Sequence, residues 1–197
     1  MNKEKDKSEK FSYSRLEKYE NCPFAYKLTY IDKHYVNASS LALSVGTLLH
    51  KVNEYICSSI IFNKAIDYDK INEYIELAGT TDIKLDVEGA KEDKEEIQGT
   101  KILQREFFED WLNNDTKSKL SMKVKVENFK KNIHKLEDSF KGSEWQPFKT
   151  EEPFDFEYNG VVFHGFIDRI DKNIKTGELR VIDYKTKDAP FSDKDLT

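Results

Sequence analysis

Hydrophobic residues recur at helical spacing in two long stretches of the chain. The first stretch predicts a helix over residues 40–62, with an apolar stripe of Leu41, Val45, Leu48, Val52, Ile56 and Ile60. The second predicts a helix over residues 117–140, with an apolar stripe of Met122, Val126, Phe129, Ile133, Leu136 and Phe140. We expect both stripes to face a hydrophobic core.

Weaker helical patterns surround these two stretches. Ser14 and Glu17 form a capping box that predicts the start of a helix, and Cys22-Pro23 should interrupt this helix. Further helices are predicted over residues 69–78 and 91–113, the second of them strongly charged.

The pattern changes to strands after Gly142-Ser143. Strands are predicted over residues 148–157, 161–171 and 179–186. The dipeptide Asn159-Gly160 is typical of a tight hairpin turn, and Gly177 lies in the next connection. The chain therefore reads as an α/β protein in which helices are followed by a mostly antiparallel β-meander.

Three charged residues on the last two predicted strands suggest metal chemistry. Asp183 and Lys185 are two positions apart, so they should share one face of their strand. If Asp168 comes from the paired strand, two carboxylates and an ammonium group converge. Carboxylate oxygens suit a hard divalent cation, and the ammonium group can steer or polarise a water molecule.

Five segments in this order resemble the PD-(D/E)XK nuclease superfamily, in particular its RecB-like and AddB-like branch. The segments are Ser12–Lys27 with its S-x-S-R-L and C-P elements, Val45–His50 with G-T-x-x-H, Glu151–Phe154, Gly165–Arg169 and Asp183–Lys185. A single D-x-K motif would be weak evidence, because it arises by chance in lysine-rich chains. Five ordered segments make the resemblance strong.

The resemblance implies a restriction-endonuclease-like core with a helical insertion. We expect residues 1–10 to form a disordered tail and residues 11–197 to form the nuclease domain. Within it, the N-terminal helices with the histidine motif span 11–62, the insertion spans 63–145 and the catalytic β-meander spans 146–197. The family core continues with a helix and a strand, which we expect to be missing, because only twelve residues follow Lys185. The chain would then be truncated, or its last elements would be supplied elsewhere.

The resemblance also implies a set of site residues. Asp168 and Asp183 would bind Mg²⁺ or Mn²⁺, together with His50 and the backbone carbonyl of Tyr184. Lys185 would orient or activate the attacking water. Glu151 would supply a further catalytic carboxylate. Its neighbour Glu152 competes for this role, since a shift of one residue exchanges the two faces of a strand.

Two groups of residues are candidates for contacts with DNA. Ser12, Arg15, Tyr19 and Tyr26 could contact the DNA backbone or stack on bases, or they could form a helix cap and packed aromatics. Residues 116–136 hold seven lysines, including Lys123 and Lys130, and these could face phosphates or form an ordinary solvated helix surface. The net charge of −5 argues only weakly against DNA binding, because the basic residues are clustered.

The two cysteines limit the cofactors. Some relatives place the first cysteine of a [4Fe–4S] cluster at the position of Cys22, but such a cluster takes four cysteines and this chain has only Cys22 and Cys57. We therefore expect no iron–sulfur cluster here. Cys22 would be a relic of a longer parent or a buried small residue, and Cys57 would belong to the core.

The composition limits which class of protein this chain can belong to. The 197 residues are 38% hydrophobic and 35% charged, which suits one substantial domain. No apolar run approaches the roughly 20 residues that span a bilayer, and the N-terminus lacks the apolar region of a secretory signal. With two distant cysteines, these features favour a cytoplasmic protein that does not enter a membrane.

The function that the resemblance implies is a Mg²⁺- or Mn²⁺-dependent deoxyribonuclease acting in DNA repair, recombination or defence. Its partners would be DNA and a helicase or another repair or defence subunit. One alternative is a catalytically inactive, nuclease-like module that binds nucleic acid or protein. A second alternative is a metal-dependent phosphoesterase that acts on a small substrate.

Overall fold

We describe a computed structural model that covers residues 10–34, 41–76, 85, 87 and 117–185. The predicted helix over 91–113 lies outside these residues, as do residues 1–9 of the predicted tail and everything after Lys185. The chain divides into two compact units, Met1–Ala38 with Glu151–Ile167, and Ser39–Thr150 with Asp168–Thr197. No described helix has the length and apolar character needed to span a bilayer.

The first unit contains the N-terminal helices and one end of a hairpin. Its elements are β1 (Lys10–Phe11), α1 (Tyr13–Asn21), α2 (Pro23–Tyr26) and the π-helix η1 (Lys27–Ile31), followed by the later part of β2 (Trp145–Tyr158) and the earlier part of β3 (Val161–Asn173). Strand β1 pairs with β3 in parallel, and Lys10 lies opposite Val162. The prediction that residue 10 belongs to a disordered tail was therefore wrong. The sequence did not reveal this strand, because two residues are too few to show an alternating hydrophobic pattern.

The start of α1 also differs from the prediction. The N-cap is Ser12 and not Ser14, since Ser12 has an extended backbone and its hydroxyl accepts the Arg15 N–H at 3.3 Å. The predicted break is confirmed, because α1 ends at Asn21 and α2 begins at Pro23.

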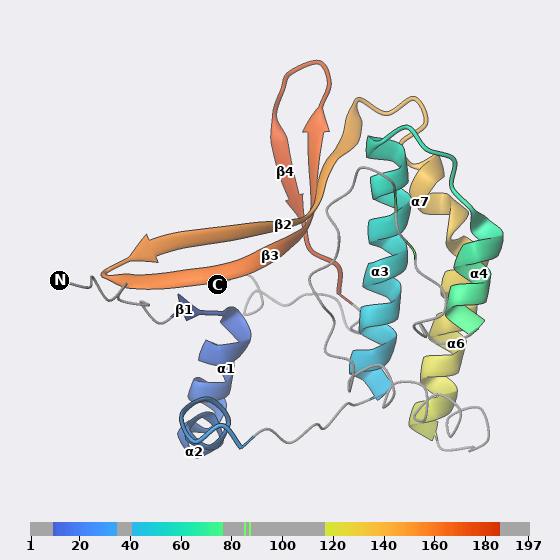
Figure 1. Ribbon diagram of the computed structural model, residues 1–197. Coiled ribbons are helices and arrows are strands. Elements are labelled where there is room, and N and C mark those ends of the chain that lie inside the picture. The colour runs from blue at the N-terminus through green and yellow to red at the C-terminus, as the bar shows by residue number, and fades with distance from the viewer. Residues whose placement is uncertain (1–9, 35–40, 77–84, 86, 88–116, 186–197) are drawn as a thin grey trace. The chain divides into compact units, whose positions relative to one another are not determined.

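The second unit contains a helical core. Its helices are α3 (Leu41–Ile61), α4 (Tyr68–Glu76), α6 (Lys117–Asn132) and α7 (His134–Asp138), which lie together in Figure 1. Both predicted apolar stripes contribute to this core, and their buried members in it are Val45, Leu48, Val52, Ile56, Val126 and Ile133. Ile60, Phe129 and Leu136 are only partly buried and pack against it. Leu85 and Val87 join the same core. Burying such side chains stabilises the fold by about 1.5–3 kcal/mol each.

The second long helix is interrupted, although the sequence predicts one continuous helix. The regular structure stops at Asn132 and resumes at His134. The Asn132 side-chain amide donates to the Asn128 carbonyl at 2.6 Å, so it competes for the acceptor that an α-helix uses four residues back. This local competition leaves no trace in the hydrophobic period.

The four-stranded sheet has the order β1-β3-β2, and β4 (Leu179–Ile182) also pairs with β3. Asn159 and Gly160 both have positive φ, at 51° and 78°, as expected for the tight turn between β2 and β3. Strand β4 is antiparallel to β3 and places Ile182 opposite Arg169. The predicted α/β class, with helices followed by a mostly antiparallel meander, is confirmed.

Strand β4 ends at Ile182, earlier than the predicted residue 186. The reason lies in one hydrogen bond beyond the strand. The Tyr184 N–H donates to the carboxylate of Asp168 at 2.6 Å, so a side chain takes the place of a ladder carbonyl. Asp183 and Lys185 consequently follow a strand and do not belong to it.

Gly165 allows close packing within the first unit. A Cβ added there would lie 2.7 Å from the Cζ atom of Phe154, whose ring stacks on Phe156, which in turn stacks on Phe163. We expect Gly165→Ala to lower the free energy of unfolding by about 1 kcal/mol, since the Phe154 ring must move. Urea unfolding measures this loss.

The matched test of this clash is a double variant. Adding Phe154→Leu to Gly165→Ala removes the ring that the new methyl group meets. The double variant should therefore lose less free energy of unfolding than the two single variants lose in total. Strictly additive losses would contradict the contact as the cause.

Candidate metal centre

His50 lies on α3, on a different helix face from the buried stripe. Its side chain is about one-third exposed. His50 Nε2 lies 2.9 Å from the Tyr184 carbonyl oxygen, and His50 Nδ1 lies 3.5 Å from Asp168 Oδ1. The ring also meets the Tyr184 ring edge to face, with centroids 5.7 Å apart. A helix, a strand and the segment after β4 therefore meet at this imidazole.

Asp168 is bound by two neighbours of different kinds. One carboxylate oxygen, Oδ2, accepts the Tyr184 N–H, and the other, Oδ1, faces His50. The side chain is 14% exposed. A carboxylate that accepts a backbone hydrogen bond is fixed in orientation, so its second oxygen has a defined direction.

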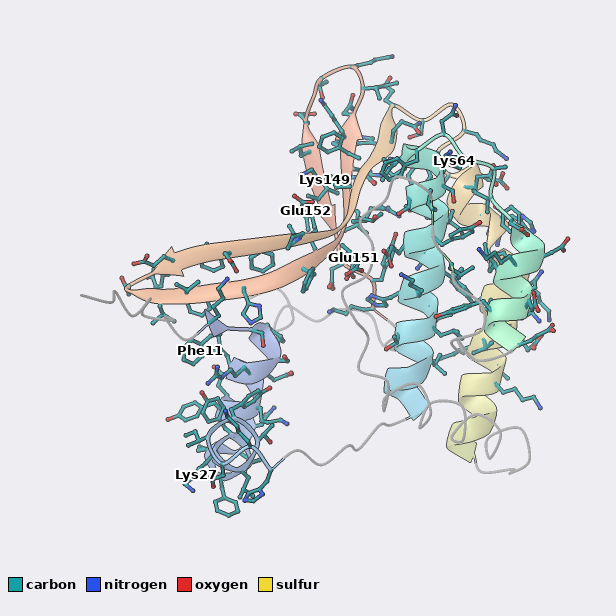
Figure 2. All side chains as sticks on the ribbon, viewed as in Figure 1. Phe11, Lys27, Lys64, Lys149, Glu151 and Glu152 are labelled. Carbon is teal, nitrogen blue, oxygen red and sulfur yellow. The ribbon has the colours of Figure 1, made fainter. Side chains whose placement is uncertain are left out.

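Glu151 follows Thr150 on β2, and Figure 2 labels it beside Glu152 on the same strand. The Thr150 hydroxyl lies 2.9 Å from the Ser58 hydroxyl, which ties this point of β2 to α3, the helix that carries His50. Glu151 has a φ of 45°, a conformation that costs a non-glycine residue about 1–2 kcal/mol. Strain of this kind gathers at functional positions more often than elsewhere.

His50, Glu151 and Asp168 each offer a ligand atom, and these atoms all lie within 4.8 Å of one another. Of the two glutamates considered from the sequence, Glu151 belongs to this group of three. No second such group occurs among the described residues. The convergence joins positions 50, 151 and 168, which are far apart in the sequence.

The donor set fits a divalent cation. Two carboxylates, a carbonyl oxygen and an imidazole nitrogen suit Mg²⁺ or Mn²⁺, and the nitrogen suits Mn²⁺ better. Adjacent ligands of an octahedral ion lie about 3 Å apart and opposite ligands about 4.2 Å, because each metal–ligand distance is about 2.1 Å. The 2.9 Å between His50 Nε2 and the Tyr184 oxygen is close to the first value. Two carboxylates this near each other also repel, and a cation relieves that repulsion.

Asp183 and Lys185 form an ion pair with each other. Lys185 Nζ lies 2.9 Å from Asp183 Oδ2, and the two side chains are 46% and 54% exposed. Asp183 is not a member of the group formed by His50, Glu151 and Asp168. The structure therefore brings together four of the predicted site residues, counting the Tyr184 carbonyl, and leaves Asp183 and Lys185 paired beside them.

A buried ion-pair network that was not predicted from the sequence is formed by Arg169, Asp171 and Arg180, and it contacts the Tyr184 hydroxyl through Arg169. Arg169 is 7% exposed and Asp171 is fully buried. Asp171 pairs with Arg169 at 2.9 Å and with Arg180 of β4 at 2.9 Å. Arg169 and Asp171 are two positions apart, so they lie on one face of their strand, and the sequence could have predicted their pairing from this spacing. The cross-strand partner Arg180 became identifiable only with the observed register, which sets it opposite Asp171.

Two neutral groups complete this network. Burial raises the pKa of the Tyr184 phenol well above its ordinary range, and Cys57 adds to the shift while Arg169 opposes it. Burial also raises the pKa of the Cys57 thiol. Both groups therefore stay protonated at neutral pH and act as hydrogen-bonding partners of Arg169.

The N-terminal candidates for DNA contact take part in local structure within the first unit. Ser12 caps α1. The Arg15 guanidinium donates to the Tyr26 hydroxyl at 3.1 Å and lies over the Phe11 ring at 4.5 Å. Tyr19 packs edge to face on Tyr26, although about half of Tyr19 is exposed. Cap and packed aromatics account for these positions, and a DNA contact stays a prediction.

Three further candidates also have described surroundings. Lys123 is exposed, and Lys130 pairs with Glu76 at 2.9 Å. Cys22 is exposed, so the alternative that it is a buried small residue was wrong. Its sulfur caps α2 by accepting the Ala25 N–H at 3.4 Å, a local role that requires no cluster. Cys57 is buried, as expected.

Comparison with known proteins adds evidence of a different kind. The family model of the PD-(D/E)XK nuclease superfamily matches residues 10–197. The chain is 30% identical over 199 residues to an ATP-dependent helicase/deoxyribonuclease subunit of Clostridium acetobutylicum, a match that covers 95% of this chain and 16% of that protein. It is 27% identical over 209 residues to the gene 69 protein of Mycobacterium phage L5, covering 94% of this chain and 67% of that protein. The chain thus spans only a small part of the first relative.

Proposed function

Because this chain belongs to the PD-(D/E)XK nuclease superfamily, we propose that it is a metal-dependent deoxyribonuclease that hydrolyses phosphodiester bonds. The observation that carries the proposal is the convergence of His50, Glu151 and Asp168, whose ligand atoms lie within 4.8 Å of one another. The match to a helicase/deoxyribonuclease subunit supports the RecB-like branch of the family.

In this proposal, His50, Glu151, Asp168 and the Tyr184 carbonyl hold Mg²⁺ or Mn²⁺. Such a cation supplies Lewis-acid activation of the phosphate and of the water nucleophile. Asp168 contributes a fixed oxygen, because its other oxygen is held by the Tyr184 N–H. His50 contributes a ring nitrogen, and its contacts with Tyr184 and Asp168 orient the imidazole ring.

Asp183 and Lys185 would separate when substrate binds. Their ion pair is about half exposed, and pairs of this kind contribute only about 0–1 kcal/mol. Separation therefore costs little. It frees the Asp183 carboxylate to join the neighbouring ligands, and it frees the Lys185 ammonium to orient the water and to counter charge that builds on the phosphate.

The substrate and partner follow from the named relative. Because that relative is a helicase/deoxyribonuclease subunit, we propose DNA as the substrate and a helicase as a partner, with a role in DNA repair or recombination. Since the chain covers 16% of that relative, the helicase activity itself is not attributed to this chain.

The direct test is cleavage of labelled DNA, linear and circular, single- and double-stranded, with Mg²⁺ or Mn²⁺. We expect cleavage that EDTA abolishes and that Asp183→Ala lowers at least about 100-fold. The matched control is Asp138→Ala, which removes another exposed aspartate paired with a lysine, Lys141, and should leave the rate unchanged.

Each outcome of this test has a clear meaning. Cleavage of circular DNA would identify internal cutting, and cleavage of linear DNA alone would identify action at ends. A folded protein that binds Mn²⁺ and DNA but leaves every substrate intact would instead support a binding-only module. Hydrolysis of simple phosphate esters without DNA cleavage would support a small-substrate phosphoesterase.

Lys185→Ala should lower the rate of DNA cleavage about 100-fold, because the developing phosphate charge loses its nearby ammonium. Its control is Lys175→Ala in the turn between β3 and β4. Lys175 pairs with Glu144 at 2.6 Å and is also exposed, so it matches Lys185 in charge and setting. Equal rates for the two variants in a steady-state cleavage assay would argue against a role for Lys185.

A further inference from the structure

The backbone and the side chain of Tyr184 make contacts of different kinds. Its carbonyl oxygen lies 2.9 Å from His50 Nε2, and its N–H donates to Asp168. Both contacts join the backbone of residue 184 to the proposed metal ligands. The phenol instead reaches Arg169 and Cys57, which are buried and belong to none of the groups that would bind the metal.

The phenol has two polar contacts. Arg169 Nη1 donates to the Tyr184 hydroxyl oxygen at 2.7 Å. Because arginine can only donate, the hydroxyl hydrogen remains available to Cys57 Sγ, 3.8 Å away. The guanidinium also lies over the Tyr184 ring, with its central carbon 5.4 Å from the ring centroid.

Arg169 is itself held in place. Asp171 accepts from its Nη2 at 3.3 Å and pairs with its Nε at 2.9 Å. Arg180 donates two hydrogen bonds to Asp171 from the next strand, at 3.0 and 2.9 Å. The Phe140 ring lies 5.2 Å from the guanidinium carbon of Arg169. A buried arginine with these contacts has little freedom to move.

Residue 184 needs such an attachment because the sheet does not extend to it. Strand β4 ends at Ile182, so the pairing with β3 no longer fixes the backbone two residues later. The direction of the Tyr184 carbonyl then depends on the N–H contact with Asp168 and on the attachment of its own side chain.

We propose that the Tyr184 hydroxyl, held by Arg169, positions the Tyr184 carbonyl and N–H against His50 and Asp168, which makes Tyr184 and Arg169 positioning residues of the metal site. The metal-site part of this inference rests on the proposed function. The geometric part concerns only how one backbone segment is held, and it applies without metal.

The variant that isolates the hydroxyl is Tyr184→Phe, which keeps the ring and the backbone. Its matched control is Tyr68→Phe on α4, because the Tyr68 hydroxyl also makes a side-chain hydrogen bond, to Glu137, but contacts none of the proposed ligands. Both variants lose one hydroxyl from a partly buried tyrosine, so both should lose similar stability. Only the first should disturb the site.

Two measurements on the metal-free and metal-titrated protein test the inference. By amide hydrogen exchange without metal, we expect the Tyr184 N–H in Tyr184→Phe to exchange about tenfold faster, while the Asn173 N–H in the same hairpin, bonded to Glu178, is unchanged. By calorimetric titration with Mn²⁺, we expect an affinity about tenfold weaker, as for other groups that orient metal ligands. Tyr68→Phe should match the wild type in both.

The outcomes separate the inference from the function on which it rests. Unchanged exchange at Tyr184 in the Phe variant overturns the inference, whatever the metal affinity. Weakened Mn²⁺ binding in Tyr68→Phe to the same degree also overturns it, because general destabilisation would then explain the loss. If the wild type binds no Mn²⁺, the proposed function fails, and hydrogen exchange alone decides how the Tyr184 backbone is held.

Arg169→Lys provides a second variant that keeps the positive charge. A lysine cannot donate to Asp171 and Tyr184 with the fixed geometry of a guanidinium, so we expect faster exchange at the Tyr184 N–H and weaker Mn²⁺ binding here too. Wild-type values for Arg169→Lys would show that charge alone suffices, and would overturn the role assigned to Arg169.

Discussion

Asp168→Asn is expected to abolish DNA cleavage, with a loss of at least about 1000-fold, and to remove measurable Mn²⁺ binding. The asparagine oxygen can still accept the Tyr184 N–H, so the segment after β4 keeps its main attachment. What disappears is the negative charge beside His50. A neutral amide oxygen binds a hard divalent cation more weakly than a carboxylate does, and one of the two neighbouring carboxylates is gone.

The control for this experiment is Asp67→Asn. The Asp67 carboxylate also accepts a backbone N–H, from Lys70 at 2.9 Å, but it lies outside the proposed ligand group. This variant should bind Mn²⁺ and cleave DNA like the wild type. Circular dichroism and thermal unfolding of both variants test whether the fold is intact. A folded Asp168→Asn protein that keeps metal-dependent cleavage would refute the site assignment.

Asp171→Ala is expected to lower the free energy of unfolding by about 3–5 kcal/mol, the largest stability effect that we foresee. Asp171 is fully buried and accepts from two arginines. Arg180 is 44% exposed and can turn to water, but Arg169 is buried and would keep an uncompensated charge. Because domains are stable by only about 5–15 kcal/mol, this loss is a large share of the total.

Urea unfolding and thermal melting measure this effect. A chain of this length should lose about 2–4 °C in melting temperature per kcal/mol. The control is Glu144→Ala, which breaks an exposed ion pair with Lys175 and should change stability by less than about 1 kcal/mol. Equal losses in the two variants would show that the Asp171 network contributes no more than a surface pair.

The structure also predicts how this loss can be reversed. Combining Asp171→Leu with Arg169→Met replaces a buried ion pair by apolar side chains, which is often neutral or stabilising. The double variant should therefore be more stable than Asp171→Ala. It would lack the donor to the Tyr184 hydroxyl, so we expect it to bind Mn²⁺ as weakly as Tyr184→Phe.

Much of the fold was predictable because its signals are local and periodic. The stripe from Val45 to Ile56 defines α3, and Asn159-Gly160 marks the turn between β2 and β3. Two of the errors occurred where a single side chain overrides a periodic pattern. Asn132 interrupts a helix by bonding the Asn128 carbonyl, and Asp168 ends the pairing of β4 by taking the Tyr184 N–H.

The candidate site also has parts that the sequence predicts and parts that only the folded structure shows. The motifs around His50, Asp168 and Asp183-Tyr184-Lys185 are visible in the sequence, and the order of five segments identified the family. The sequence left Glu151 and Glu152 as alternatives, because strand register decides which side chain faces which side. The catalytic and metal-binding roles proposed for these residues stay predictions. The roles of Ser12, Arg15 and Lys130 in DNA binding also stay predictions.

The sequence by itself determined the family, the order of the long helices and of β2, β3 and β4, and the residue types available to bind a metal. These properties depend on local spacing and composition, which a linear chain contains. Only the tertiary structure decided that Asp183 pairs with Lys185 and that Glu151 joins His50 and Asp168. It also decided that Arg169, paired with the buried Asp171, donates to the Tyr184 hydroxyl. Most of those contacts join residues far apart in sequence or on neighbouring strands, and the Asp183–Lys185 pair forms because β4 ends before both residues. Their energies therefore depend on register and burial, which exist only in the folded chain.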